Sequence, residues 1–202
     1  MAGIQKAKRE EAARKLLEAA LTCVQENGMA ALHAREIARR SGYSVGSVYK
    51  YYEDLDDILI NVNSITLGRI RATIEDAVAG LEDPLERLKR LAHAYHAFAR
   101  GNTKLWEALF GHQLPEGRTI PDEHREQNIA LLSIIGRALS ELNPSLSQKD
   151  LEARTRSCFA AVHGVVLINI ENRFVGLEGD TFDREMDFVV EQLARDTRPA
   201  GQ

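Results

Sequence analysis

Apolar residues recur through most of the chain at the three- and four-residue spacing that places them on one face of an α-helix. The first such stretch covers residues 8–27, and its apolar stripe consists of Leu16, Leu17, Ala20, Leu21 and Val24. The same spacing predicts further helices at residues 55–78, 84–100, 122–142, 151–174 and 180–195, and a short aromatic helix at 105–110. Residues 165–170, VVLINI, have the composition of a strand, but no partner strand is visible. We therefore predict an all-α protein.

Two shorter helices with a tight turn between them are predicted in residues 34–52, AREIARRSGYSVGSVYKYY. Gly42 ends the first helix, because glycine takes the left-handed conformation without a Cβ penalty. Ser44 is the expected N-cap of the second. One face of that second helix consists of Val45, Val48, Tyr49 and Tyr52. Small, hydroxylated and basic residues on it are typical of a recognition helix that enters the major groove, although an ordinary helical hairpin would share much of this pattern.

The charges are divided unevenly along the chain. The 202 residues carry a net charge of −4, but residues 1–52 hold nine basic and five acidic side chains. The remaining residues hold 17 basic and 25 acidic side chains. A basic head on an acidic body confines phosphate contacts to the head.

Four segments together resemble the N-terminal domain of the TetR family, the tetracycline-repressor-like transcriptional regulators. They are LLEAALTCVQENG at 16–28, REIARRSG at 35–42, SVGSVYKYY at 44–52 and DIL at 57–59. The resemblance implies a three-helix helix-turn-helix head, a long fourth helix, and a helical body that binds a ligand and dimerises, with about nine helices in all. We place the DNA-binding domain at residues 1–53 and the ligand-binding and dimerisation domain at 54–202.

The residues that we expect to contact DNA lie on the two short helices and at their starts, with His33, Arg35 and Arg39 expected to hold phosphates and the others to meet base edges. They are His33, Arg35, Arg39, Ser44, Val45, Gly46, Ser47, Tyr49, Lys50 and Tyr51. Val48 and Tyr52 are expected to pack inside the head. The sequence departs from the family at His33, where a threonine is common, and at Leu55, where a lysine is usual. Acidic residues surround Leu55, which puts one phosphate contact in doubt.

A head this small makes few base contacts, so specificity favours two heads on a palindrome with half-sites about 34 Å apart. The resemblance implies a homodimer formed through the helices at 151–174 and 180–195. Gly164 would allow close helix approach there. Ordinary intramolecular core would produce the same periodicity, so the pattern alone leaves both interpretations open.

An apolar cavity for an unknown small-molecule effector is also implied mainly by the resemblance. Aromatic and polar side chains in the body supply its expected lining, namely Tyr95, Phe98, Trp106, Phe110, Phe159 and His163. An aromatic stripe at helical spacing is also typical of plain core.

Other chemistry has little support in the sequence. A glycine-rich phosphate loop, GxSxG, HExxH and paired CxxC are all absent, so we expect neither an enzyme nor a cofactor. His93 and His96 lack a third ligand at a motif spacing, so no metal site is expected. Cys23 and Cys158 fit reduced core cysteines.

No apolar run is long enough to cross a bilayer, and the first residues lack the apolar centre of a secretion signal. These features predict a cytoplasmic protein. The resemblance implies a transcriptional regulator, most simply a repressor released from its operator by a ligand. The alternative is a helical small-molecule-binding or protein-interaction module without DNA binding. Leu55 and the acidic residues at 53–57 favour that alternative.

Overall fold

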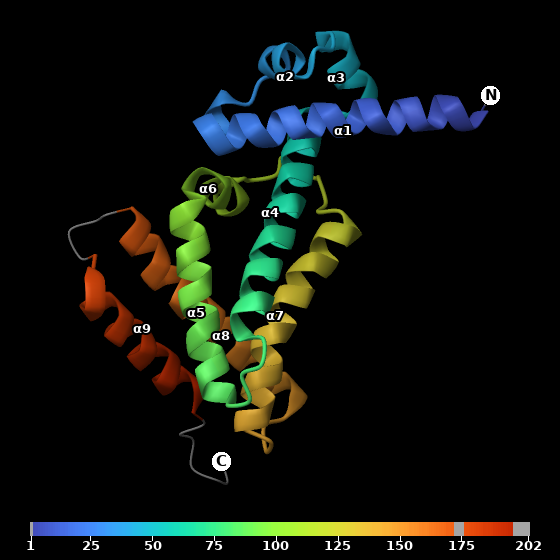
Figure 1. Ribbon diagram of the computed structural model, residues 1–202. Helices are drawn as coiled ribbons and strands as arrows, with labels where there is room; N and C mark the ends of the chain where they lie inside the picture. Colours follow the sequence, from blue (N-terminus) through green and yellow to red (C-terminus); the bar gives the residue numbers. More distant parts are fainter. Residues whose placement is uncertain (1, 172–175, 196–202) are drawn as a thin grey trace. The chain divides into compact units, whose positions relative to one another are not determined.

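The computed structural model describes residues 2–171 and 176–195, and within these ranges it contains nine α-helices, one short 3-10 helix and no strand (Figure 1). The helices are α1 Ala2–Asn27, η1 Met29–Ala31, α2 Ala34–Ser41, α3 Val45–Tyr51, α4 Leu55–Val78, α5 Pro84–Gly101, α6 Thr103–Gly111, α7 Asp122–Leu142, α8 Gln148–Ile170 and α9 Gly179–Ala194. The segment VVLINI lies inside α8. The all-α prediction is confirmed.

Most predicted boundaries agree with the structure to within a few residues, and the differences have local causes. Helix α1 begins at Ala2 rather than at residue 8, although its first turns are exposed. Helix α8 begins at Gln148 because Ser147 caps it, accepting a hydrogen bond from the Asp150 N–H at 3.2 Å. The predicted end of this helix at residue 174 lies outside the described residues.

The chain folds as two compact units. The first comprises the chain up to Gly68 together with Asn102–Arg125, and the second comprises Arg69–Gly101 and the chain from Glu126 onward. Helix α4 contributes residues to both units. The predicted division at residue 53 is a functional one and stays a prediction.

The first unit is built on the apolar stripe of α1. Leu16 and Val24 are completely buried with Ile37 of α2, Val48 of α3 and Ile58 of α4. The Tyr52 hydroxyl donates to the Ala13 carbonyl at 2.9 Å, which ties the end of α3 to α1. Val48 and Tyr52 therefore pack in the head, as the helical periodicity predicts. Closing this core fixes which side of α3 remains exposed.

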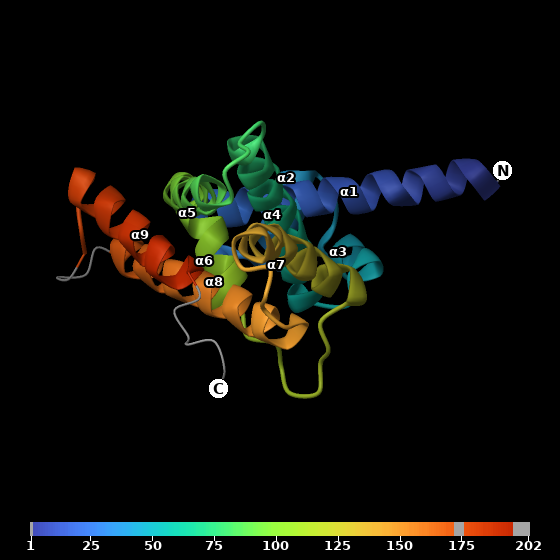
Figure 2. The same ribbon diagram turned by 90° about the horizontal axis from the view of Figure 1, so that it is seen from below.

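In the second unit α5 lies against both α8 and α9 (Figures 1 and 2). Polar contacts reinforce the apolar packing between α5 and α9, since Lys89 pairs with Glu191 at 2.6 Å and His93 Nε2 lies 2.8 Å from Asp187. The side chain of Asn143, just after α7, donates to the Ala194 carbonyl at 2.8 Å. The core of this unit includes Leu88, Leu91, Tyr95, Phe98, Leu139, Val166, Phe182, Met186 and Val190.

Two glycines offer a matched test of this backbone. Gly68 lies inside α4, where an added Cβ would meet nothing within 4 Å, whereas Gly42 ends α2 at φ 76°. Gly68→Ala is expected to raise the free energy of unfolding by about 0.5–1 kcal/mol through lower chain entropy. Gly42→Ala is expected to lower it by about 1–2 kcal/mol, since alanine is strained in the left-handed region. Urea unfolding of both variants measures the difference, and a destabilised Gly68→Ala protein would contradict the helical assignment.

Candidate DNA-binding surface and body sites

The turn between α2 and α3 has the predicted geometry. Gly42 adopts the left-handed conformation and its N–H donates to the Ala38 carbonyl at 3.0 Å. Ser44 caps α3, accepting from the Ser47 N–H at 3.2 Å, and the two serine hydroxyls lie 2.9 Å apart. His33 stands at the N-cap of α2 without a side-chain capping bond. Its imidazole is therefore not used by the helix end.

Helix α3 presents one side to solvent. Val48 is completely buried, whereas Val45 is 39% and Tyr49 54% exposed, a large fraction for apolar and aromatic side chains. Gly46 and Lys50 are also exposed. Tyr51 differs from its neighbours, because it is half-buried and packs against the core of the head. The Lys50 Nζ atom lies 5.7 Å from the centre of the Tyr51 ring, within the range of a cation–π contact.

The predicted phosphate-binding cations are not equally available. Arg35 is exposed and has no ion-pair partner among the residues described. Arg39 donates two hydrogen bonds to Glu36, at 2.8 and 2.6 Å, and Arg40 bridges Glu36 and Glu26. The guanidinium groups of Arg39 and Arg40 lower the pKa of Glu36 to about 2. Arg39 must therefore share or leave a carboxylate before it can meet a phosphate.

The acidic residues around Leu55 build the start of α4. Asp54 caps the helix by accepting from the Asp57 N–H at 2.8 Å, and the Asp57 side chain accepts from the Glu53 N–H at 3.1 Å. The pKa of the Asp54 carboxyl is lowered mainly by the hydrogen bond from the Asp57 N–H, and the Arg118 guanidinium lowers it further. Leu55 is half-buried and packs against the core of the head. Leu55 and the neighbouring carboxylates therefore have structural roles at the start of α4.

The loop between α6 and α7 is attached to the same acidic helix start. Arg118 forms ion pairs with Asp54 and with Glu53, the latter at 3.6 Å. His112 Nε2 lies 2.8 Å from an oxygen of Asp56. Our sequence reasoning missed these partners, because they are more than 50 residues away in the chain and no local spacing signals them.

Three of the six predicted ligand-binding residues lie together in the second unit. The Tyr95 hydroxyl and His163 Nδ1 are 2.7 Å apart, and the Phe159 ring lies 6.1 Å from Tyr95 and 5.6 Å from His163 between centres. Phe98 is buried in the same unit.

The other two belong to the first unit. Trp106 is 1% exposed and Phe110 lies beside it at 5.2 Å between ring centres. Trp106 is therefore a buried residue of α6.

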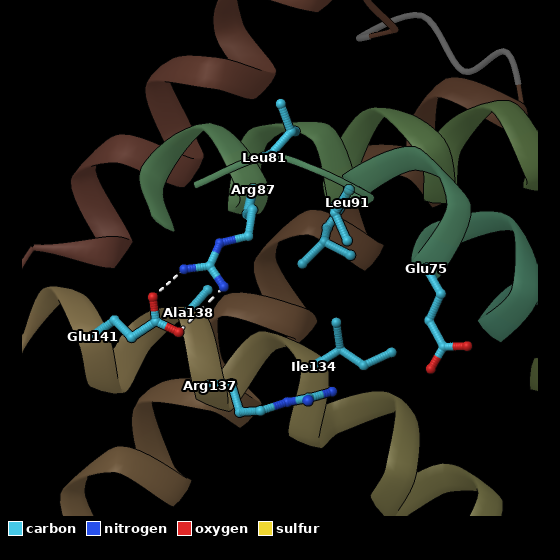
Figure 3. Close-up of a pocket in the computed structure, with 9 residues that line it drawn as sticks. Glu75, Leu81, Arg87, Leu91, Ile134, Arg137, Ala138 and Glu141 are labelled. Atoms are coloured by element: carbon cyan, nitrogen blue, oxygen red, sulfur yellow. Dashed lines mark hydrogen bonds and ion pairs between the residues drawn. The ribbon is translucent and has the colours of Figure 1, made fainter. Parts of the chain in front are cut away.

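A separate pocket of about 290 Å³ lies in the second unit (Figure 3). Its lining comes from the end of α4, the following link, the start of α5 and the second half of α7, namely Glu75, Val78, Leu81, Arg87, Leu91, Ile134, Arg137, Ala138 and Glu141. None of the predicted ligand-binding residues lines it. Helical periodicity could not have found this pocket, because it forms where three helices meet.

The histidines and cysteines are engaged in packing. His93 contacts Asp187 and Asp183, and His96 Nε2 lies 3.0 Å from the Asn169 side-chain oxygen. In the part of the chain that is described, no group of three potential ligands is arranged to hold a metal. Cys23 and Cys158 are free thiols in the core, and burial raises the pKa of Cys158 to about 11. Across residues 2–171 and 176–195, no helix is long and apolar enough to span a bilayer.

Burial makes stability depend on pH through histidines. It lowers the pKa of His163, and likewise of His96 and His124, below the usual value of 6.5. The stability that comes from keeping them neutral is present above pH 6.5 and is lost as pH falls through the lowered folded-state pKa. We expect the free energy of unfolding to fall below pH 6.5, and to fall less in His163→Gln. Urea unfolding at pH 7.5, 6 and 5 tests this, and equal slopes for both proteins would contradict it.

Two family models cover most of the chain. The model described as "Bacterial regulatory proteins, tetR family" matches residues 16–62, and the model described as "Tetracyclin repressor-like, C-terminal domain" matches residues 88–193. The first match contains α2 and α3, and the second contains most of the body helices.

Individual relatives agree with these matches. The transcriptional regulator HbdR of Aromatoleum sp. (strain CIB) is 33% identical over 88 residues, which cover 44% of this chain but only 38% of HbdR. The regulator BetI of Yersinia pestis is 22% identical over 193 residues, covering 93% of this chain and 90% of BetI.

Solved structures show the same fold. FadR of Bacillus subtilis, a transcriptional regulator solved with stearoyl-CoA, has a TM-score of 0.67 at 19% identity, covering 90% of this chain and 97% of FadR. The helix-turn-helix geometry, the solvent-facing side of α3 and the two family matches together lead to one conclusion. The chain belongs to the TetR family of bacterial regulatory proteins.

Proposed function

We propose that this regulator is a homodimeric repressor that binds a palindromic operator in the cytoplasm and releases it when a small molecule binds the body. The observation that carries the proposal is the exposed side of α3. Its apolar anchor, Val48, is buried in the head, while Val45, Tyr49 and Lys50 face solvent. A short helix held this firmly can approach base edges without distorting its own core.

The predicted DNA contacts then take different roles. Ser44, Val45, Gly46 and Ser47 form the first turn of α3 and its cap, where the backbone can come closest to the bases. Val45 suits a thymine methyl group, and Lys50 suits a guanine or a phosphate. His33 and Arg35 suit phosphates that fix the register. Arg39 would join them by exchanging Glu36 for phosphate, and Tyr51 would act mainly by positioning Lys50.

Dimerisation through α8 and α9 is supported by a solvent-facing stripe of small residues on α8. Along this helix the small residues Ala153, Ser157, Ala160 and Gly164 follow one another at three- and four-residue spacing, and the apolar Ile168 continues the row. A Cβ at Gly164 would meet nothing within 4 Å, and Phe188 on α9 is 56% exposed. Small residues allow two helices to approach closely, and exposed apolar side chains favour burial against a second copy.

Ligand control would pass through α4. This helix contributes residues to both compact units, and its start is capped within the head. A displacement of its body end would therefore be transmitted to the DNA-binding head. A ligand that prefers one arrangement of the body shifts the population toward it, and the two heads then no longer match the spacing of the half-sites. Tyr95, Phe159 and His163 form the aromatic group that we propose for the ligand-contacting surface, with Phe98 beside them in the same unit.

Fluorescence anisotropy with labelled duplex tests the DNA-binding part. Binding is expected to weaken steeply as salt rises, because cationic side chains displace counterions from DNA. Even random duplex should bind weakly at low salt. Binding that is absent, or indifferent to salt, in a folded protein would contradict the proposal.

A further inference from the structure

The pocket between α4, α5 and α7 combines charge with an apolar surface. Figure 3 shows Arg87 facing Glu141 on one side and Glu75 on the opposite side, with Arg137 along the edge formed by α7. The apolar part of the lining consists of Val78, Leu81, Leu91, Ile134 and Ala138. The volume of about 290 Å³ is at the small end of ligand pockets. A single ring or a short chain fits this size.

The carboxylates of this pocket already have cationic partners. Glu141 receives two hydrogen bonds from the terminal nitrogens of Arg87, one of them at 3.2 Å. Glu75 pairs with Arg71 at 2.9 Å. Neither carboxylate is therefore left to attract a cation.

The arginines retain unused hydrogen-bond donors. The Nε atom of Arg87 is buried and has no hydrogen-bond partner among the described residues, a situation that native proteins usually avoid. Arg137 is exposed, and the described part of the chain provides it with no ion pair. An anion in the pocket would pair with the exposed Arg137 guanidinium more strongly than a neutral acceptor would, and a cation would be repelled by both arginines.

We propose that this pocket binds a small organic monocarboxylate, with the carboxylate toward Arg137 and Arg87 and the short apolar body against Leu81, Leu91 and Ile134. This is a second ligand site in addition to the aromatic group of the proposed function, and it rests on that function for its regulatory meaning. The site is separate from the aromatic group around Tyr95. It places the acid at the end of the body where α4 ends and α5 begins.

Isothermal titration of the full-length protein tests the site with hexanoate and benzoate as probes. Hexanamide and benzamide are neutral controls of the same shape, and acetate lacks the apolar body. We expect the two acids to bind at least about tenfold more tightly than the amides or acetate, because charge-assisted hydrogen bonds and apolar burial both contribute.

Variants assign the binding to the pocket. Arg137→Gln is expected to weaken hexanoate and benzoate binding about tenfold. Arg90→Gln is the matched control, since Arg90 is an exposed arginine on α5 outside the pocket lining, and it should leave binding unchanged. Thermal unfolding of both variants checks that each remains folded.

The inference is overturned if neither acid binds, if acids and amides bind equally, or if Arg137→Gln and Arg90→Gln behave alike. Release of DNA is measured separately by anisotropy with the same acids. If acid binding depends on Arg137 but leaves the affinity for DNA unchanged, the result supports the pocket as a binding site. The same result contradicts the proposal that this ligand releases the protein from DNA. The two proposals therefore fail in distinguishable ways.

Discussion

Replacing Lys50 with alanine is expected to lower the affinity of the protein for its operator by about tenfold to a hundredfold. Lys50 is the basic side chain on the exposed side of α3, and its ammonium nitrogen lies 5.7 Å from the centre of the Tyr51 ring. In a dimer the change removes one contact from each head. Anisotropy at one fixed salt concentration measures the loss.

Lys149→Ala is the control for this prediction, because it removes an equal charge from an exposed position at the start of α8. It should bind the operator as the unaltered protein does. Equal losses in the two variants would mean that Lys50 acts only through net charge.

Tyr49→Ala should reduce the ratio of specific to random DNA binding. An unchanged ratio would remove Tyr49 from the set of base-contacting residues.

Ala160→Arg is expected to convert the protein into a monomer and to weaken operator binding about a hundredfold or more. Ala160 is exposed in the single chain, so arginine there should leave the fold intact. In the proposed dimer it would separate two closely packed α8 helices. Losing the second head removes the effective concentration that links the two half-sites. Sedimentation equilibrium reports the mass, and anisotropy reports the affinity.

Ala72→Arg provides the comparison, since it places the same side chain at an exposed position of α4. That variant should remain dimeric. If Ala160→Arg also stays dimeric with full affinity, the interface does not use the small stripe of α8. A monomer that keeps full operator affinity would contradict the need for two heads.

Much of the head could be predicted from sequence because its rules are local. Gly42 and Ser44 act within one turn of the chain, and the spacing of Val48 and Tyr52 separates the buried side of α3 from the exposed one. The start of α5 follows the same local rules, because Asp83 stands directly before Pro84 and its carboxylate accepts from the Glu86 N–H at 2.8 Å. Capping and periodicity need no knowledge of distant segments.

The candidate sites were less accessible to such reasoning. The Glu36 pairing with Arg39 and Arg40 has three- and four-residue spacing, so a local signal existed and was not used. The tether from Arg118 to Asp54 joins positions far apart in the chain, and only folding brings them together. The six predicted ligand-binding residues were grouped by their aromatic and polar chemistry. The structure divides them between the two units, with Trp106 in the first and Tyr95 in the second.

Selection of bound sequences from randomised duplex tests the central claim most directly, namely that two copies of α3 read one symmetric operator. The account predicts an enriched inverted repeat whose half-sites lie about one helical turn, or a small departure from it, apart. A single unpaired half-site, or no enrichment by a folded protein, would contradict it.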